Sequence, residues 1–218
     1  MSMNFEVART QMVNQQVRAW EVLDPAVLAV LSSVPREQFV PPRYRNLAFA
    51  DTAIPLPGGQ EMMTPQVEGR LLQALTIRGT DRVLEIGTGS GFLTACLARL
   101  AASVTSLEFL PGLAEDGRRN LRSVSTWNAD VRHVDVFQYR PQQAFDVIAV
   151  TGSVPQHDER FQHWLADGGR LFLVTGEAPM MQARLVTRQG QEQWATATLF
   201  ETTLPALLHA TAPSKFSF

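Results

Sequence analysis

Apolar runs alternate with stretches of helical spacing over the middle of the chain. Between positions 81 and 176, short apolar runs are separated by segments whose apolar residues recur every three or four positions. This alternation is typical of an α/β fold, a doubly wound and mostly parallel sheet with helices on both faces. The pattern predicts strands at 82–87, 103–108, 130–136, 144–151 and 169–175, and helices at 90–101, 111–123 and 158–166.

Later signals set the limits of this core. Gly168-Gly169 is expected to stop the third helix. After Gly176, the segments Arg184–Thr187 and Trp194–Leu204 are predicted to form a C-terminal antiparallel hairpin that closes the edge of the sheet.

The first 80 residues have a different character. Asp24-Pro25 and Thr64-Pro65 each have the form of a helix start and precede apolar residues at helical spacing. The proline-punctuated segment between them, 39–60, is predicted to be an extended loop placed to cover a cofactor cleft. We therefore expect an N-terminal helical and loop lid at 1–80, a core at 81–210 and a tail at 211–218.

Composition narrows the classes of protein that fit. The chain has 218 residues, 45% of them hydrophobic, which is enough for one large domain with a buried core. A formal net charge of -2 without a basic run predicts no nucleic-acid or membrane partner, and no run approaches the roughly 18 apolar residues of a membrane span. We expect a cytoplasmic protein. The single Cys96 and four scattered histidines predict no disulfide and no metal site.

The most informative stretch is 83–92, an apolar strand that ends in an acid and runs into three alternate glycines. Glycines allow a sharp turn and leave backbone amides open to a ligand. A dinucleotide fingerprint requires a glycine where this chain has Phe92 or Thr94, and a phosphate loop requires a lysine, whereas the only lysine is Lys215. The motif resembles the first motif of class I S-adenosylmethionine-dependent methyltransferases, with a tight turn that binds nothing as the alternative. The cofactor-binding residues implied are Glu85, Gly87, Thr88, Gly89, Ser90 and Gly91.

Two further acids lie at or near the ends of predicted strands. Glu108 ends the next strand, where two acceptor oxygens could bind both ribose hydroxyls, although a solvated strand-end glutamate is the alternative. Asp135 lies near the end of the third predicted strand, after Val131 and Val134, and in the methyltransferase pattern this position faces the adenine amino group. A turn aspartate is the alternative there. Their neighbours Phe109 and Val136 are included in the predicted cofactor site.

Strings outside the glycine motif resemble one family of that class, the protein-L-isoaspartate (D-aspartate) O-methyltransferases. The most specific is Val-Pro-Arg-Glu-Gln-Phe-Val-Pro at 34–41, and others occur in order at 48–51, 54–60, 144–151 and 165–171. The resemblance implies a Rossmann-like fold and transfer of a methyl group from S-adenosyl-L-methionine to the free α-carboxylate of isoaspartyl residues in damaged proteins. It also implies a monomer.

The sequence departs from the family pattern at the expected junction of cofactor and substrate. Met63 stands where the family has a serine, and a thioether cannot donate the hydrogen bond of a hydroxyl. Thr64 is the nearest hydroxyl and the candidate catalytic residue, with helix capping as its alternative role. On the resemblance, the substrate-binding residues are Ile54, Pro55, Met63, Thr151 and Gly152.

Three functions are therefore open. The first is a repair methyltransferase that acts on isoaspartyl peptides. The second is an enzyme of the same fold in which Met62 and Met63 reshape an apolar pocket for another carboxylate or a small metabolite. The third is a non-catalytic protein that binds S-adenosylmethionine.

Overall fold

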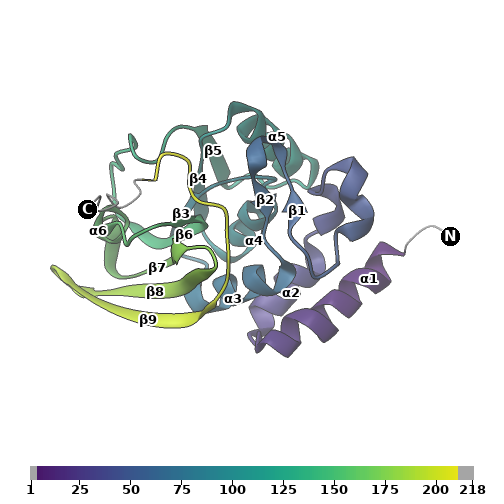
Figure 1. Ribbon diagram of the computed structural model, residues 1–218, viewed down its shortest axis with the longest axis horizontal. Helices are drawn as coiled ribbons and strands as arrows, with labels where there is room; N and C mark the ends of the chain where they lie inside the picture. The colour runs from purple at the N-terminus through teal and green to yellow at the C-terminus, as the bar shows by residue number, and fades with distance from the viewer. Residues whose placement is uncertain (1–3, 211–218) are drawn as a thin grey trace, which may run out of the picture.

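A seven-stranded sheet forms the centre of the computed structural model, which describes residues 4–210 (Figure 1). The strand order is β5-β4-β3-β6-β7-β8-β9; pairs from β5 to β7 are parallel, and β8 and β9 add an antiparallel hairpin. The predicted tail lies outside the described residues. The strands are β3 (Arg82–Ile86), β4 (Ser103–Glu108), β5 (Ala129–His133), β6 (Phe145–Val154), β7 (Leu165–Glu177), β8 (Met180–Gly190) and β9 (Gln193–Glu201).

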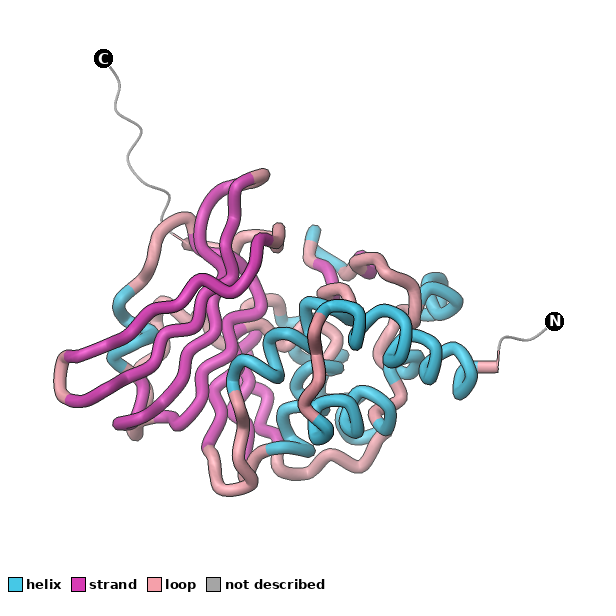
Figure 2. Tube along the Cα trace, turned by 90° about the horizontal axis from the view of Figure 1, so that it is seen from below, coloured by secondary structure: helices cyan, strands magenta, loops and turns pink. Residues whose placement is uncertain are grey.

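Helices cover the two faces of the sheet unequally, and Figure 2 shows most of them gathered to one side of the strands. One face packs on α2 to α5 in a cluster that includes Val83, Val147 and Phe172, while the other packs on α6 through Phe161. The helices are α1 (Phe5–Gln11), α2 (Pro25–Ser33), α3 (Pro65–Leu75), α4 (Phe92–Leu100), α5 (Pro111–Ser123) and α6 (Glu159–His163). The predicted α/β class with helices on both faces is confirmed.

The prediction that Gly168-Gly169 ends a helix was wrong. The helix α6 already ends at His163, and β7 begins at Leu165, which pairs with Phe145. The two glycines lie inside β7 at a register shift, where Gly168 adopts a left-handed φ of 70°. An irregularity in the pairing explains them, since β7 has four residues between the pairs Phe145–Leu165 and Val147–Arg170 where β6 has only Asp146, and such an insertion bends the chain and favours glycine.

The N-terminal segment is less extended than predicted. In the loop predicted at 39–60, 3₁₀ turns form at Pro42–Leu47 and Pro57–Gly59, and β1 (Ile54–Pro55) pairs with β2 (Glu61–Met62). Before the loop, a π-helical turn forms at Met12–Val17 and a 3₁₀ turn at Arg36–Gln38. Buried residues of this segment belong to the same hydrophobic cluster as α4 and one face of the sheet. The two parts predicted at 1–80 and 81–210 therefore share one core.

Arg36 pins the N-terminal segment to α3 and α4. Its side chain is 1% exposed and forms an ion pair with Glu68 of α3. The guanidinium also donates to the carbonyl oxygens of Ala48 and Met63, each at 2.8 Å, and lies 4.6 Å from the ring centroid of Phe92. One buried side chain thus fixes the backbone of residue 63 beside the start of α4.

Candidate active site

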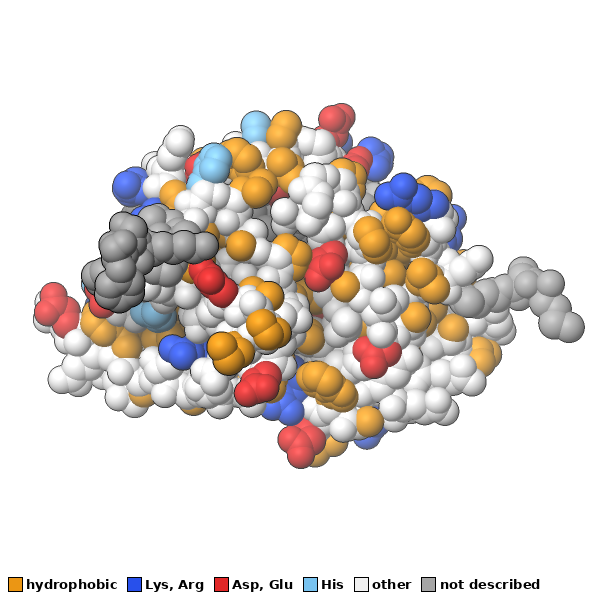
Figure 3. All heavy atoms as spheres, in the orientation of Figure 1, with side chains coloured by type: hydrophobic (Ala, Val, Ile, Leu, Met, Phe, Trp, Pro, Cys, Tyr) orange, Lys and Arg blue, Asp and Glu red, His pale blue; other side chains and the backbone are white. Residues whose placement is uncertain are grey.

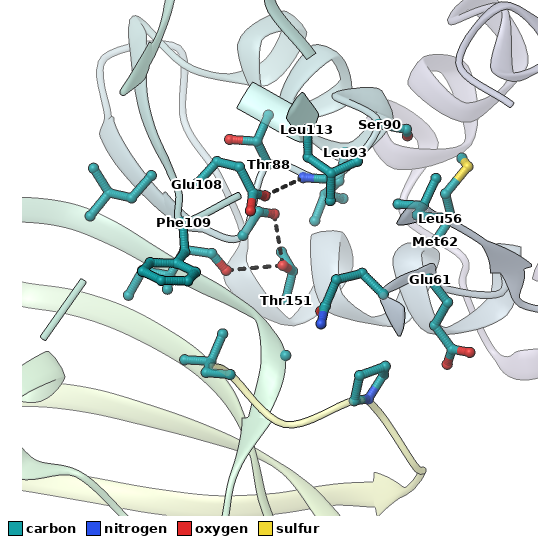
Figure 4. Close-up of a pocket in the computed structure, with 18 of the residues that line it drawn as sticks. Leu56, Glu61, Met62, Thr88, Ser90, Leu93, Glu108, Phe109, Leu113 and Thr151 are labelled. Atoms are coloured by element: carbon teal, nitrogen blue, oxygen red, sulfur yellow. Dashed lines mark hydrogen bonds between the residues drawn. The ribbon is translucent and has the colours of Figure 1, made fainter. Parts of the chain in front are cut away.

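The site is a pocket at the carboxyl ends of the parallel strands, between the sheet and the β1–β2 segment (Figure 4). It holds about 890 Å³ of empty space, part of it open to solvent. Ligands of open α/β sheets bind at this edge. Eleven residues that the sequence assigned to cofactor or substrate line it, namely Met63, Gly87, Thr88, Gly89, Ser90, Glu108, Phe109, Asp135, Val136, Thr151 and Gly152.

The glycine turn after β3 forms the floor of the pocket. Gly87, Gly89 and Gly91 have φ of 99°, 53° and 86°, a region that side chains other than glycine rarely adopt. A Cβ on Gly87 would collide with the hydroxyl of Thr151, and a Cβ on Gly91 would come within 3.3 Å of the backbone of Gly117. Gly91 itself lies outside the lining, so its role is to let α4 and α5 approach each other.

Thr151 of β6 ties the turn to the neighbouring strand. Its hydroxyl oxygen lies 2.9 Å from the carbonyl oxygen of Ile86 and 2.8 Å from that of Gly87 (Figure 4). Because a hydroxyl has one proton, that proton is committed to the backbone. The side chain predicted to bind substrate therefore has only acceptor capacity left for a ligand.

Glu85 supports the turn from beneath. It is fully buried outside the lining, so the predicted contact with cofactor becomes a role in support. Its Oε2 accepts hydrogen bonds from Thr94 of α4 and Ser106 of β4, each at 2.5 Å, and Ser106 accepts one from Thr88 at 2.6 Å. Burial raises the pKa of Glu85 to about 8, against the effect of the two hydroxyls. This chain of hydrogen bonds fixes the orientation of Thr88 in the turn.

Glu108 presents a carboxylate to the pocket from the end of β4. Oε2 accepts from the amide of Gly89 and Oε1 from the amide of Leu110, both at 2.9 Å. Since a carboxylate has about four acceptor positions, each oxygen keeps capacity for another donor. Two adjacent ligand hydroxyls fit this arrangement, as the sequence predicts.

The opposite end of the pocket, toward β1 and β2, is largely apolar. Met63 is 5% exposed and lines it together with Leu56, Met62, Phe92 and Leu93, of which the sequence placed only Met62 and Met63 in such an apolar pocket. Leu56, Phe92 and Leu93 were missed because they come from the β1–β2 segment and the start of α4, which spacing along the chain does not bring together.

Three predicted residues lie outside the lining at this end. Ile54 is fully buried, Pro55 is exposed, and Thr64 lies beyond Met63. Thr64 occupies the N-cap position of α3, but its side chain makes no capping hydrogen bond. Neither of its two predicted roles, capping through the hydroxyl or contact with the pocket, is visible in the structure.

Carboxylates at this end carry less charge than their number suggests. Glu68 is 2% exposed and lines the pocket beside its partner Arg36, and burial raises its pKa to about 7 although Arg36 opposes the rise. Partial burial also raises the pKa of Glu61 above its ordinary value. Because its pKa is near 7 and Arg36 is its partner, Glu68 repels an anionic ligand group only weakly near neutral pH.

The lining fits a nucleoside without phosphates better than a phosphorylated ligand. The glycine cradle is one that a Cβ would fill, Glu108 offers acceptors to hydroxyls, and a carboxylate there would repel phosphate.

Within residues 4–210, no group of three or more His, Cys, Asp or Glu side chains is placed to hold a metal. No helix in that range is long and apolar enough to cross a membrane. Acidic, basic and apolar side chains are interspersed over the face in Figure 3.

Comparisons with known proteins agree with this site. The sequence profile of the family described as protein-L-isoaspartate(D-aspartate) O-methyltransferase (PCMT) matches residues 8–205. Protein-L-isoaspartate O-methyltransferase 2 of Pelobacter propionicus is 37% identical over 90% of this chain and 88% of its own. Protein-L-isoaspartate O-methyltransferase 1 of an Anaeromyxobacter species is 40% identical over 83% of this chain and 86% of its own.

The fold has a solved counterpart. A Plasmodium falciparum protein assigned to the same enzyme class, crystallised with S-adenosyl-L-homocysteine, matches with a TM-score of 0.81. The match covers 94% of this chain and 99% of that one at 19% identity, so it establishes the shared fold.

Proposed function

The chain belongs to the protein-L-isoaspartate(D-aspartate) O-methyltransferase family of class I S-adenosylmethionine-dependent enzymes, and we propose that it methylates the free α-carboxylate of L-isoaspartyl residues in damaged proteins. Isoaspartyl peptides and proteins are then its partners. We also propose that it is a cytoplasmic protein and, as the family resemblance suggests, a monomer.

S-adenosylmethionine, when bound, supplies a methyl group on a positively charged sulfur. On this proposal, Glu108 holds the ribose hydroxyls, the glycine turn accommodates the part of the cofactor nearest the backbone, and Asp135 accepts from the adenine amino group. The apolar residues at the β1–β2 end exclude water from the acceptor side.

An isoaspartyl carboxylate makes modest demands on the protein. A carboxyl group with a pKa near 4 is already ionised at neutral pH, so no general base is needed. Alignment of two bound groups can supply on the order of 7 to 11 kcal/mol. The raised pKa of Glu68 and its pairing with Arg36 reduce repulsion of the incoming anion. The chain's residues therefore need to orient the acceptor and keep water out.

One observation carries the proposal to this family's substrate. The lid segment from Leu56 to Met63, which the family match includes, forms the wall of the pocket opposite Glu108 and Phe109 (Figure 4). The glycine turn is common to the whole methyltransferase class, whereas this wall faces the acceptor.

Met63 favours a second candidate, transfer to a different carboxylate or small metabolite. The thioether is buried in the lining where the family resemblance implies a serine, and Arg36 binds the backbone carbonyl rather than the side chain. An apolar group on the acceptor would gain contacts there that a serine would not provide. Membership of an enzyme family disfavours the non-catalytic alternative.

The test compares the wild type and Met63→Ser on an isoaspartyl peptide, its normal aspartyl twin and a panel of small carboxylates. The proposal predicts that the wild type methylates the isoaspartyl peptide and leaves the twin unmodified. Transfer to that peptide by Met63→Ser alone, with another carboxylate methylated by the wild type, would establish the second candidate instead. Met180→Ser, at an exposed position far from the lining residues in sequence, is the matched control.

A further inference from the structure

A C-terminal strap, defined as residues 204–210, closes one side of the pocket. Ser153 of β6 holds it through three hydrogen bonds: its amide donates to Pro205 O at 2.8 Å, its hydroxyl donates to Leu204 O at 3.0 Å, and its carbonyl accepts from the amide of Leu207 at 2.8 Å. Pro205 and Leu207 line the pocket, and Figure 4 shows this yellow segment crossing below Thr151. The strap is part of the site.

Gly152 allows the strap to lie close to β6. A Cβ at this position would stand 2.8 Å from a methyl carbon of Leu207 and 3.1 Å from the carbonyl oxygen of Pro205. Any larger residue would displace the strap from the pocket rim. Gly152 was predicted to bind substrate, and the close packing of the strap gives a second reason for a glycine at this position.

The strap ends in a contact with the opposite rim. His209 Nδ1 lies 2.7 Å from Asp135 Oδ2, although the two residues are 74 positions apart. The imidazole also packs edge-on against Phe109, with ring centroids 4.6 Å apart. Asp135 and Phe109 both line the pocket, and His209 lies behind them with its side chain 56% exposed.

The backbone of His209 is held in an uncommon conformation. Its φ of 67° is in the left-handed region, which histidine tolerates better than most residues but adopts rarely. Such conformations persist where surrounding contacts determine them, and they cluster at ligand clamps. The contacts with Asp135 and Phe109 are the ones that this backbone conformation permits.

The pairing fixes the Asp135 carboxylate from two sides. An ionised carboxylate only accepts, so Nδ1 of His209 donates to Oδ2, while the amide of Phe137 donates to Oδ1 at 2.9 Å. Acceptor positions remain for one more donor from the pocket. We propose that His209 is a positioning residue for nucleoside recognition, which holds Asp135 and Phe109 where they select an adenine amino group. This inference rests on the proposed cofactor site and is independent of which acceptor is methylated.

The test is calorimetric binding of S-adenosyl-L-homocysteine and of S-inosyl-L-homocysteine, in which a carbonyl replaces the adenine amino group. A carbonyl cannot donate to Asp135, so the ratio of the two affinities reports this recognition. His209→Ala should weaken binding of the adenosyl ligand by about three- to tenfold and that of the inosyl ligand much less. His209→Asn should restore most of the ratio, because its amide donates from a similar position and asparagine tolerates a positive φ.

Each other outcome overturns the inference. An unchanged affinity for the adenosyl ligand in His209→Ala, or an equal loss for both ligands, would leave His209 with a structural role only. A second test places His209→Ala in an Asp135→Asn background. There the substitution should change the ratio of the two affinities no further. An effect as large as in the wild-type background would also overturn the inference. If Glu108→Gln leaves binding of the adenosyl ligand intact, the cofactor site itself is misplaced, which separates that failure from failure of the His209 role.

Discussion

At the scale of the residue, the glycines after β3 each meet a separate steric demand. The Cβ that Gly87 lacks would occupy the space of the Thr151 hydroxyl, and the one that Gly89 lacks would lie 3.3 Å from a methyl carbon of Leu56. One glycine thus lets a strand approach the turn, and the other lets the lid approach it. The pocket depends on both close contacts, because its walls are β6 and the β1–β2 segment.

Gly87→Ala should therefore damage the site while leaving the rest of the fold in place. The new Cβ forces Thr151 away and strains a backbone with φ of 99°, so binding of S-adenosyl-L-homocysteine should weaken by about tenfold or more. Isothermal titration calorimetry measures this. Gly112→Ala, where nothing lies within 4 Å of the added carbon, is the control and should bind like the wild type. Equal affinities for both variants would contradict the account of the turn.

At the scale of the element, Glu85 joins β3, α4 and β4. Its Oε2 accepts hydrogen bonds from Thr94 and Ser106, whereas Oε1 is buried without a hydrogen-bond partner among the described residues. An unpaired buried oxygen makes the charged form costly, which agrees with a pKa raised to about 8. The carboxyl group is therefore neutral in the folded protein between about pH 4.5 and 8, where it is ionised in the unfolded chain.

This difference predicts a dependence of stability on pH. Between the ordinary pKa of 4.5 and the folded value of about 8, the folded state binds the extra proton, so stability falls as the pH rises through this interval. Glu85→Gln removes the titration, and its free energy of unfolding should fall less steeply, by on the order of 1 kcal/mol per pH unit. Urea unfolding at several pH values from 5 to 8 measures both slopes. Parallel slopes would show that Glu85 does not titrate in this range.

Arg36 joins the lid to α3, as Glu85 joins β3 to α4 and β4. Arg36→Lys keeps the charge but loses the fork that reaches Glu68, Ala48 and Met63 together, so it should destabilise the protein by about 2–4 kcal/mol. It should also increase cleavage by protease within residues 39–60. Arg119 forms an exposed ion pair with Asp116 within α5. Arg119→Lys is therefore the matched control and should change stability little. A variant at position 36 as stable as this control would contradict the pinning role.

How far the sequence predicts these elements depends on what bounds them. β4 and α5 agree with prediction to the residue, because an apolar run ends at Glu108 and Pro111 starts the next helix. β7 and β8 extend well beyond prediction because strand pairing continues through polar and glycine positions. At the site, the glycine turn and Glu108 could be found from the motif. The support role of Glu85 and the contact of His209 with Asp135 depend on which way a side chain faces and on a pairing 74 residues apart.

At the scale of the whole molecule, the lid and the sheet pack against each other. Trp20 packs edge-on against Phe200 of β9 with centroids 6.1 Å apart, and Arg70 lies 5.1 Å from the same ring. Gln73 of α3 accepts from the amide of Asp24 at 2.9 Å. The contacts of Phe200 connect the N-terminal segment to the last strand, and the Gln73 hydrogen bond connects parts of that segment, in addition to the shared hydrophobic cluster.

Unfolding should accordingly be a single cooperative transition. The calorimetric and van 't Hoff enthalpies should agree, and S-adenosyl-L-homocysteine at about 100 times its Kd should stabilise the whole protein by about 2.7 kcal/mol. Differential scanning calorimetry with and without the ligand tests this. Two separated transitions, of which the ligand shifts only one, would show that the lid folds independently.

The central claim is that this pocket transfers a methyl group to an isoaspartyl carboxylate. Its most direct test is transfer of labelled methyl from S-adenosylmethionine to an isoaspartyl peptide, with the normal aspartyl peptide of the same sequence measured in parallel. The account predicts base-labile label on the isoaspartyl peptide alone. Equal labelling of the two peptides, or none on either by an enzyme that binds the cofactor, would contradict it.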